Sequence, residues 1–174
     1  EFEQRNFSLA KNYLEQVIEI IPDSEAAETA QTLVLQIDAR RKVNPKTVGV
    51  VLPLIGRHSH VAQKTLRGLQ LGLGIFGKDL SNFELAIIDS EGNPDAARRA
   101  VEKLVIEVHV IAVVGSLLSR TSMAVAAKAN ELGVPSIALS QKPDITQVGE
   151  FVFRNSLTSE MQIERLVEQA MNAQ

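Results

Sequence analysis

The chain has 174 residues and a mass of 19.0 kDa, the size of one ordinary domain or of a compact domain with an appendage. Hydrophobic residues make up 45% of the sequence and charged residues 22%, so wholesale disorder is excluded. The net charge of -3 argues against a nucleic-acid-binding surface, and the absence of cysteine excludes disulfides, thiolate zinc sites and cysteine nucleophiles.

Neither a membrane span nor an export signal is visible. No stretch approaches the roughly 18 to 20 uninterrupted apolar residues that a membrane-spanning helix needs. The chain opens on Glu1-Phe2-Glu3-Gln4-Arg5, without an initiator methionine or the apolar segment of a signal peptide. Either a signal has been removed or the chain is an excised fragment, and we expect a fragment.

Two helices joined by a short turn are predicted for residues 1–44. The apolar residues of the first helix that recur at helical spacing are Phe7, Ala10, Leu14, Val17, Ile18 and Ile21. Pro22-Asp23-Ser24 ends this helix and supplies the cap of a second helix, which runs from about Glu25 to Arg40. Because the turn is so short, the pattern predicts an antiparallel helical hairpin.

Part of this hairpin matches a repeat pattern, carried by Asn6, Phe7, Ala10, Leu14, Ile18 and Pro22. These residues resemble the second half of a tetratricopeptide repeat. A lone hairpin cannot bury its whole apolar stripe, and such arrays usually need about three or more repeats. The resemblance therefore implies that the hairpin is the last piece of a longer helical array upstream. The alternative is an amphipathic hairpin that packs only on its own domain.

From Thr47 onward, short apolar runs alternate with helical segments. The predicted strands are Val48–Leu52, Phe83–Ile88, Val108–Val114, Pro135–Leu139 and Phe151–Phe153. The predicted helices are Val61–Phe76, ending at Gly77, then Asp95–Glu107, Ser119–Leu132 and Ser159–Met171. This alternation predicts an α/β fold, a five-stranded parallel doubly wound sheet with helices on both faces, preceded by the hairpin. The nearly all-apolar strands agree with a sheet covered on both sides.

The loop after the third strand is the most informative candidate site, because ligands of open parallel sheets bind outside the carboxyl ends of the strands. Gly115-Ser116 begins this loop, and a cluster of hydroxyl groups opens the next helix. Helix N-termini leave backbone amides unpaired and attract carboxylates and phosphates. Ser119 or Thr121 is predicted to hydrogen-bond such a ligand while Arg120 pairs with it. The competing interpretation is that Ser119 only caps the helix, and spacing alone favours capping.

The end of the fourth strand adds the polar residues Ser140, Gln141 and Lys142. Two adjacent strand ends rich in hydroxyl or amide groups predict a polar crevice. The predicted ligand-binding residues are Ser119, Arg120, Thr121, Ser140, Gln141 and Lys142. No Ser/His/Asp set and no pair of carboxylates stands out as catalytic machinery, so the sequence indicates binding and not a reaction.

No metal site and no cofactor site is predicted. His58 and His60 flank Ser59 without a carboxylate or third histidine nearby, so solvated loop histidines are expected. The same loop lacks the glycine-rich fingerprints of dinucleotide and phosphate binding. Asp89, after the second strand, is predicted to accept hydrogen bonds from nearby backbone amides. A phosphoacceptor receiver is disfavoured, because its acidic residues after the first and third strands are missing.

Six motifs follow one another along the α/β region. They are Val48-Gly49-Val50-Val51-Leu52-Pro53-Leu54 with Gly56, Arg67-Gly68-Leu69-Gln70-Leu71-Gly72, Asp89-Ser90-Glu91-Gly92-Asn93-Pro94, Val113-Val114-Gly115-Ser116, Gly133-Val134-Pro135-Ser136-Ile137 and Phe151-Val152-Phe153-Arg154-Asn155. In this order they resemble the first lobe of type I periplasmic solute-binding proteins, the branched-chain amino-acid receptor group. The resemblance implies a division of the chain into a tetratricopeptide-like hairpin, residues 1–44, and a first lobe, residues 45–174, with the second lobe absent.

Within this group, Leu52-Pro53-Leu54 and Gly115-Ser116-Leu117-Leu118, together with the hairpin, look like penicillin-binding-protein activator lipoproteins. Those are periplasmic proteins tethered to the outer membrane that stimulate cell-wall synthases. The resemblance implies a non-catalytic periplasmic domain that senses a ligand or docks a protein, with the hairpin meeting a protein partner. One alternative is an amino-acid uptake receptor of an ABC transporter. An enzyme on a Rossmann-like sheet is the alternative from another class.

The resemblance also implies roles for the predicted site residues. In the amino-acid receptors, the positions that align with Ser119–Thr121 and Ser140–Lys142 hold the ligand's carboxylate and ammonium groups. Arg120 is bulkier than its counterpart, Lys142 replaces a threonine-like residue, and Val61 falls where an aromatic ring often covers the ligand. These departures disfavour leucine-type ligands and suit a more acidic ligand or none. Because the family closes two lobes around its ligand, we expect these 174 residues alone to bind weakly or not at all.

Overall fold

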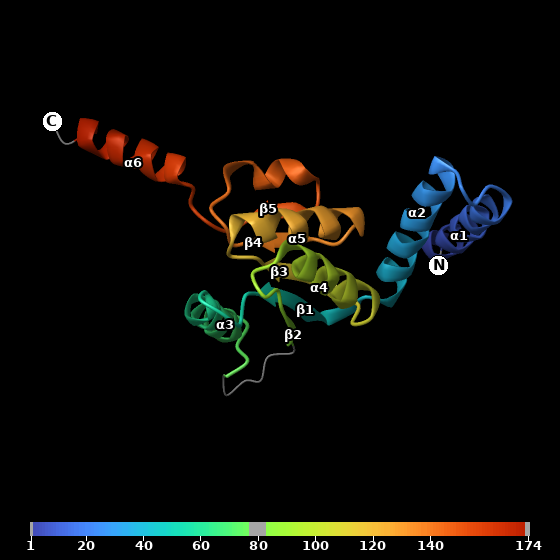
Figure 1. The fold of residues 1–174 in the computed structure, drawn as a ribbon, viewed down its shortest axis with the longest axis horizontal. Coiled ribbons are helices and arrows are strands. Elements are labelled where there is room, and N and C mark those ends of the chain that lie inside the picture. Colours follow the sequence, from blue (N-terminus) through green and yellow to red (C-terminus); the bar gives the residue numbers. More distant parts are fainter. Residues whose placement is uncertain (1, 77–82, 173–174) are drawn as a thin grey trace.

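The computed structural model describes residues 2–76 and 83–172, which form a helical hairpin followed by an α/β unit (Figure 1). The helices are α1 Phe2–Ile20, α2 Glu25–Lys42, α3 Ser59–Gly72, α4 Pro94–Ile106, α5 Ser119–Glu131 and α6 Ser159–Asn172, with a short 3-10 helix η1 at Pro143–Val148. The strands are β1 Asn44–Leu52, β2 Glu84–Asp89, β3 Val110–Gly115, β4 Ser136–Ala138 and β5 Val152–Arg154.

All five strands belong to one sheet and run parallel, in the order β2-β1-β3-β4-β5. In its register, Val50 of β1 lies opposite Ile87 of β2 on one side and Val114 of β3 on the other. The predicted five-stranded parallel sheet is confirmed. Because the strands are parallel, all their carboxyl ends lie at one edge of the sheet, which we call the carboxyl edge.

Three element predictions differ from the structure by more than one or two residues. Strand β1 begins at Asn44 instead of Val48. The third helix begins at Ser59 and ends at Gly72 instead of spanning 61–76, because Gly74 adopts a left-handed φ of 71° that the helix cannot continue through. The predicted helix end at Gly77 lies outside the described residues. The 3-10 helix at Pro143–Val148 was not predicted, because six residues are too few to show a helical period.

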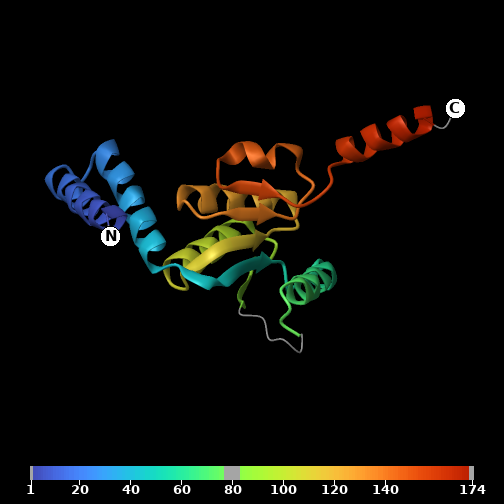
Figure 2. The ribbon, with the colours of Figure 1, turned by 180° about the vertical axis from the view of Figure 1, so that it is seen from behind.

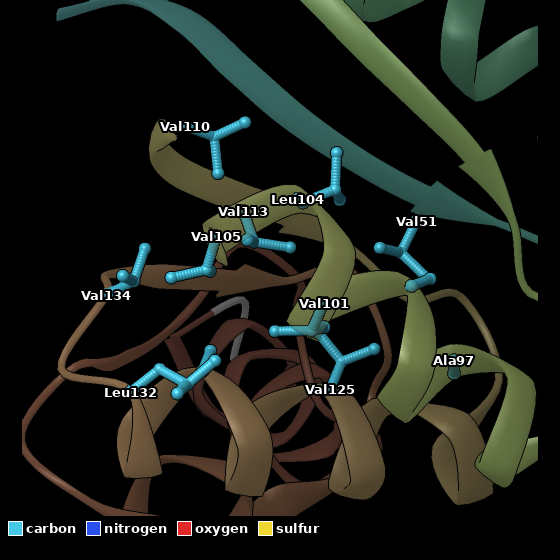
Figure 3. Packing of buried hydrophobic residues seen from close by; sticks show 12 residues of the cluster. Val51, Ala97, Val101, Leu104, Val105, Val110, Val113, Val125, Leu132 and Val134 are labelled. Carbon is cyan, nitrogen blue, oxygen red and sulfur yellow. The ribbon is translucent and has the colours of Figure 1, made fainter. Parts of the chain in front are cut away.

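The larger hydrophobic core lies between the sheet and helices α4 and α5 (Figure 3). Its central side chains, Val51 from β1, Leu104 from α4 and Val113 from β3, are fully buried. Gly49 of β1 allows this approach, since a Cβ there would lie 3.0 Å from the Cδ1 atom of Leu104. Burial of each such side chain stabilises the fold by about 1.5 to 3 kcal/mol.

The opposite face of the sheet is covered by α3. Val50 and Leu52 point to this face because side chains alternate along a strand, and they pack against Ala62 of α3. Helices therefore cover both faces, as predicted. Ile111 of β3 and Phe153 of β5 keep 39% and 53% of their surface exposed, so the cover extends over only part of the sheet.

The helical hairpin forms as the sequence predicts. Ser24 caps α2, because its Oγ atom accepts a hydrogen bond from the Ala27 amide at 3.1 Å. Lys11 of α1 reaches across to Asp38 of α2, with Nζ 2.6 Å from Oδ2, and this hydrogen bond raises the pKa of Lys11. The division of the chain at residue 44 into two domains stays a prediction.

The hairpin and α6 lie at opposite ends of the molecule (Figure 2). The hairpin adjoins the amino end of β1, because α2 ends at Lys42 and the strand begins at Asn44. A hydrogen bond of 2.5 Å from Gln36 Nε2 to the carbonyl oxygen of Glu131 joins α2 to the end of α5. Helix α6 extends away from the sheet, and none of its described residues is buried.

Candidate functional site

The turn between β3 and α5 forms the centre of the carboxyl edge and is fixed by its own hydrogen bonds. Ser116 Oγ lies 2.6 Å from Thr121 Oγ1, which in turn donates to the Leu118 carbonyl oxygen at 3.0 Å. Ser122 Oγ donates to the Ser116 carbonyl oxygen at 2.8 Å. Ser116, Thr121 and Ser122 are fully buried. The turn is therefore held in one conformation from within.

Gly115 lets this turn lie against β1. Its φ angle is 136°, in a region that side chains rarely adopt, and a Cβ atom there would lie 2.1 Å from the carbonyl oxygen of Val51. A backbone atom cannot move aside as a flexible side chain can. Glycine at this position is thus required both by its conformation and by the close approach of the two strands.

The prediction that Ser119 caps α5 is wrong. The N-cap is Leu118, whose backbone is extended (φ −90°, ψ 131°) and whose side chain makes no capping hydrogen bond. Ser119 is already the first helical residue, and it is exposed. The N-cap side chain therefore leaves the first amides of α5 uncapped, and the end of this helix keeps its capacity to bind an anion.

Arg120 is exposed beside this helix end, and within residues 2–76 and 83–172 it takes part in no ion pair. Thr121, by contrast, is fully buried with its hydroxyl already bonded inside the turn. Thr121 therefore positions the turn and offers no free group to a ligand in this conformation. Of the three residues predicted here, only Ser119 and Arg120 face solvent.

The end of β4 lies next to this turn, because Val114 of β3 pairs with Ile137 of β4. Ser140 is 1% exposed, and its Oγ atom has no hydrogen-bond partner among the described residues. Its carbonyl oxygen accepts from Ser156 Oγ at 2.5 Å. A buried hydroxyl without a partner costs free energy, which a bound ligand or water would recover.

The two residues after Ser140 have different environments. Gln141 is exposed, whereas Lys142 is half-buried with its Nζ atom 3.4 Å from Asp144 Oδ1. Arg154 holds this loop in place by donating to the carbonyl oxygen of Pro143 at 2.6 Å. Sequence reasoning missed this role of Arg154, since no local pattern links it to a loop eleven residues earlier. That the polar groups on these two neighbouring strand ends bind a ligand stays a prediction.

Asp89 ties the ends of β1 and β2 together, which confirms its predicted role as an acceptor for backbone amides. Its Oδ1 atom accepts from the Leu54 amide at 2.9 Å and from the Glu91 amide at 2.7 Å. Asp89 Oδ2 and the hydroxyl of Ser90 are buried without a partner among the described residues. Ser90 thus adds a second unsatisfied hydroxyl at the carboxyl edge. Sequence reasoning missed it, because the residue type does not show that this hydroxyl is buried.

The histidine loop after β1 shows no metal site. Arg57 Nε donates to His58 Nε2 at 2.8 Å, so that ring nitrogen acts as an acceptor. Across the described part of the chain, no group of three or more histidine, aspartate or glutamate residues is placed to hold a metal ion. None of the described helices is both long and apolar enough to cross a membrane.

Comparison with known proteins identifies relatives of the α/β unit. A family model described as periplasmic binding protein matches residues 45–174. A leucine binding protein from Thermotoga maritima is 26% identical over 67% of this chain and 34% of its own, with a TM-score of 0.59. An ABC transporter substrate-binding protein from Sphaerobacter thermophilus is 28% identical over 66% of this chain and 33% of its own, with the same TM-score of 0.59.

A more distant structure shares the fold. It is a solute binding protein of an ABC transporter from Rhodopseudomonas palustris in complex with 4-hydroxybenzoate, 21% identical over 66% of this chain and 32% of its own, with a TM-score of 0.56. This chain therefore spans about a third of the length of the structures it matches. No curated protein matches it.

Proposed function

The chain belongs to the periplasmic binding protein family, and from this premise we propose that it forms one lobe of a two-lobed, non-catalytic receptor for a small carboxylate ligand. The observation that carries the proposal is the carboxyl edge, where the uncapped end of α5 lies beside Arg120 and the end of β4. Partial positive charge at the helix end and a guanidinium group together suit an anion.

We assign the ligand contacts residue by residue. Ser119 and Arg120 would meet the ligand's carboxylate, because both are exposed at the start of α5. Ser140 would contribute its unsatisfied hydroxyl, and Gln141 and Lys142 would add polar groups from the next strand. Leucine and 4-hydroxybenzoate, named for two of the similar structures, share a carboxylate group, which supports this ligand class.

We further propose a periplasmic location, which the family supports, and outer-membrane attachment of the full-length form as a lipoprotein. In this proposal the hairpin formed by α1 and α2 meets a protein partner, as in a receptor that acts on cell-wall synthesis. A second candidate is an amino-acid uptake receptor, favoured because the similar structures include substrate-binding proteins of ABC transporters. The attached hairpin favours the first candidate, because uptake receptors are normally compact.

Calorimetric titration of the protein encoded by the complete reading frame tests the ligand site. Leucine, glutamate and 4-hydroxybenzoate are the probes, and Arg120→Ala is the variant. Removing the guanidinium group is expected to weaken binding of the preferred carboxylate by about tenfold to a hundredfold, since a hydrogen bond to a charged group contributes about 1.5 to 3 kcal/mol.

Arg99→Ala provides the matched control, because Arg99 is exposed on α4, away from the carboxyl edge. Its affinity is expected to equal that of the unmodified protein. A carboxylate that binds equally well to both arginine variants would remove Arg120 from the site and with it the proposed position of the ligand.

A further inference from the structure

An apolar groove lies between the two helices of the hairpin, far from the carboxyl edge (Figure 1). Phe7, Tyr13 and Val17 of α1 form one side, and Leu33 and Ile37 of α2 form the other. Its volume is about 500 Å³. Tyr13 and Leu33 keep 61% and 40% of their surface exposed, so the groove is open to solvent.

The dimensions of this groove fit a helix. The distance from Phe7 to Val17 is ten residue steps, or about 15 Å along the axis of α1 at about 1.5 Å per step. An amphipathic helix that places side chains at positions i, i+4 and i+7 in a groove spans about 10 Å between its first and last anchor. A partner helix can therefore bury three successive apolar side chains along this length.

The turn of the hairpin gives the groove one acidic end. Residues 15–28, which we call the acidic tip, contain the five carboxylates Glu15, Glu19, Asp23, Glu25 and Glu28 and no lysine or arginine. Glu15 lies 3.7 Å from Lys11 Nζ. The other four take part in no ion pair within residues 2–76 and 83–172. Val17 belongs to the last turn of α1, so the groove runs up to this tip.

We propose that this groove, the hairpin groove, binds an amphipathic α-helix of a partner protein that buries an apolar stripe between α1 and α2 and carries basic residues where it meets the acidic tip. This inference rests on the proposal above that the hairpin meets a protein partner, and it names the chemistry of that partner. The apolar walls bury the apolar stripe of the partner helix. The unpaired carboxylates favour a helix with basic residues and determine in which direction it lies along the groove. An acidic helix would bring like charges together at the acidic tip, and this repulsion weakens its binding.

Fluorescence anisotropy with two designed helical peptides tests this proposal on the 174-residue chain. Both peptides are 20 residues long and carry the same leucine stripe at i, i+4 and i+7 spacing. One has four lysines at one end, and the other has four glutamates in their place. The lysine peptide is expected to bind about tenfold more tightly at low ionic strength, and added salt is expected to reduce this difference.

Two aspartate variants distinguish binding in the hairpin groove from nonspecific hydrophobic binding elsewhere on α1 and α2. Leu33→Asp places a charge in the wall of the groove and is expected to weaken binding of the lysine peptide at least tenfold. Leu9→Asp changes a leucine of α1 that is 59% exposed but does not line the groove. Binding to this control is expected to stay within about twofold of the unmodified chain. Circular dichroism checks whether both variants keep their helices.

Three results would overturn the inference. The first is equal binding of the two peptides, and the second is no binding of either. The third is a dimer of the chain, seen by sedimentation velocity, that Leu33→Asp abolishes, because the occupant of the groove would then be a second copy. None of these results bears on ligand binding at Arg120, so failure here and failure of the ligand-site proposal are read out separately.

Discussion

Replacing Gly115 with alanine is expected to lower the free energy of unfolding by about 3 kcal/mol or more. The added Cβ atom would lie 2.1 Å from the carbonyl oxygen of Val51, and the residue has a φ angle of 136°. Relief requires β1 and β3 to separate at the point where the Ser116 turn begins. Urea denaturation followed by circular dichroism measures the loss.

Gly68→Ala is the matched control for this substitution. Gly68 lies within α3, and a Cβ atom there would meet nothing within 4 Å. Alanine favours a helix interior over glycine, so this variant is expected to gain about 0.5 to 1 kcal/mol. If Gly115→Ala unfolds at the same urea concentration as the unmodified chain, the close packing of β1 against the turn after β3 is contradicted.

Replacing Asp89 with alanine is expected to cost about 2 kcal/mol. The carboxylate accepts the amides of Leu54 and Glu91 at 2.9 and 2.7 Å, and alanine leaves both amides without this acceptor. Because these bonds join the loops that follow β1 and β2, their loss loosens the carboxyl edge. Thermal and urea unfolding of the purified variant measure the effect.

Asparagine at the same position distinguishes the hydrogen bonds from the side-chain volume. Its amide oxygen can replace Oδ1 as acceptor for both backbone amides, so Asp89→Asn is expected to lose less than half of what alanine loses. Equal losses for the two variants would show that the acceptor role of Oδ1 is not what stabilises this edge.

The sheet could be predicted from the sequence because its strands are short apolar runs separated by clear turn residues. Val50 and Leu52 face α3 and Val51 faces α4, as alternation along a buried strand requires. The 3-10 helix η1 was missed because six residues are too few to show a helical period. Helix α3 ends earlier than predicted because Gly74, two residues beyond its end, adopts a left-handed φ of 71°.

The candidate site was only partly predictable, because burial and capping depend on tertiary packing. The choice between Leu118 and Ser119 as N-cap depends on which residue keeps extended backbone angles, and residue type alone favoured the serine. Thr121 and Ser140 are polar but buried, since neighbouring strands and the Ser116 turn enclose them. Arg120, a long charged side chain at a helix start, is exposed as its chemistry suggests.

Hydrogen–deuterium exchange on the protein encoded by the complete reading frame shows whether a ligand binds at the carboxyl edge. The exchange is compared without ligand and with saturating leucine, glutamate or 4-hydroxybenzoate. The bound carboxylate is expected to slow exchange in peptides covering residues 115–122 and 140–142. Ligand-dependent protection that leaves both of these segments unchanged would contradict binding at the carboxyl edge.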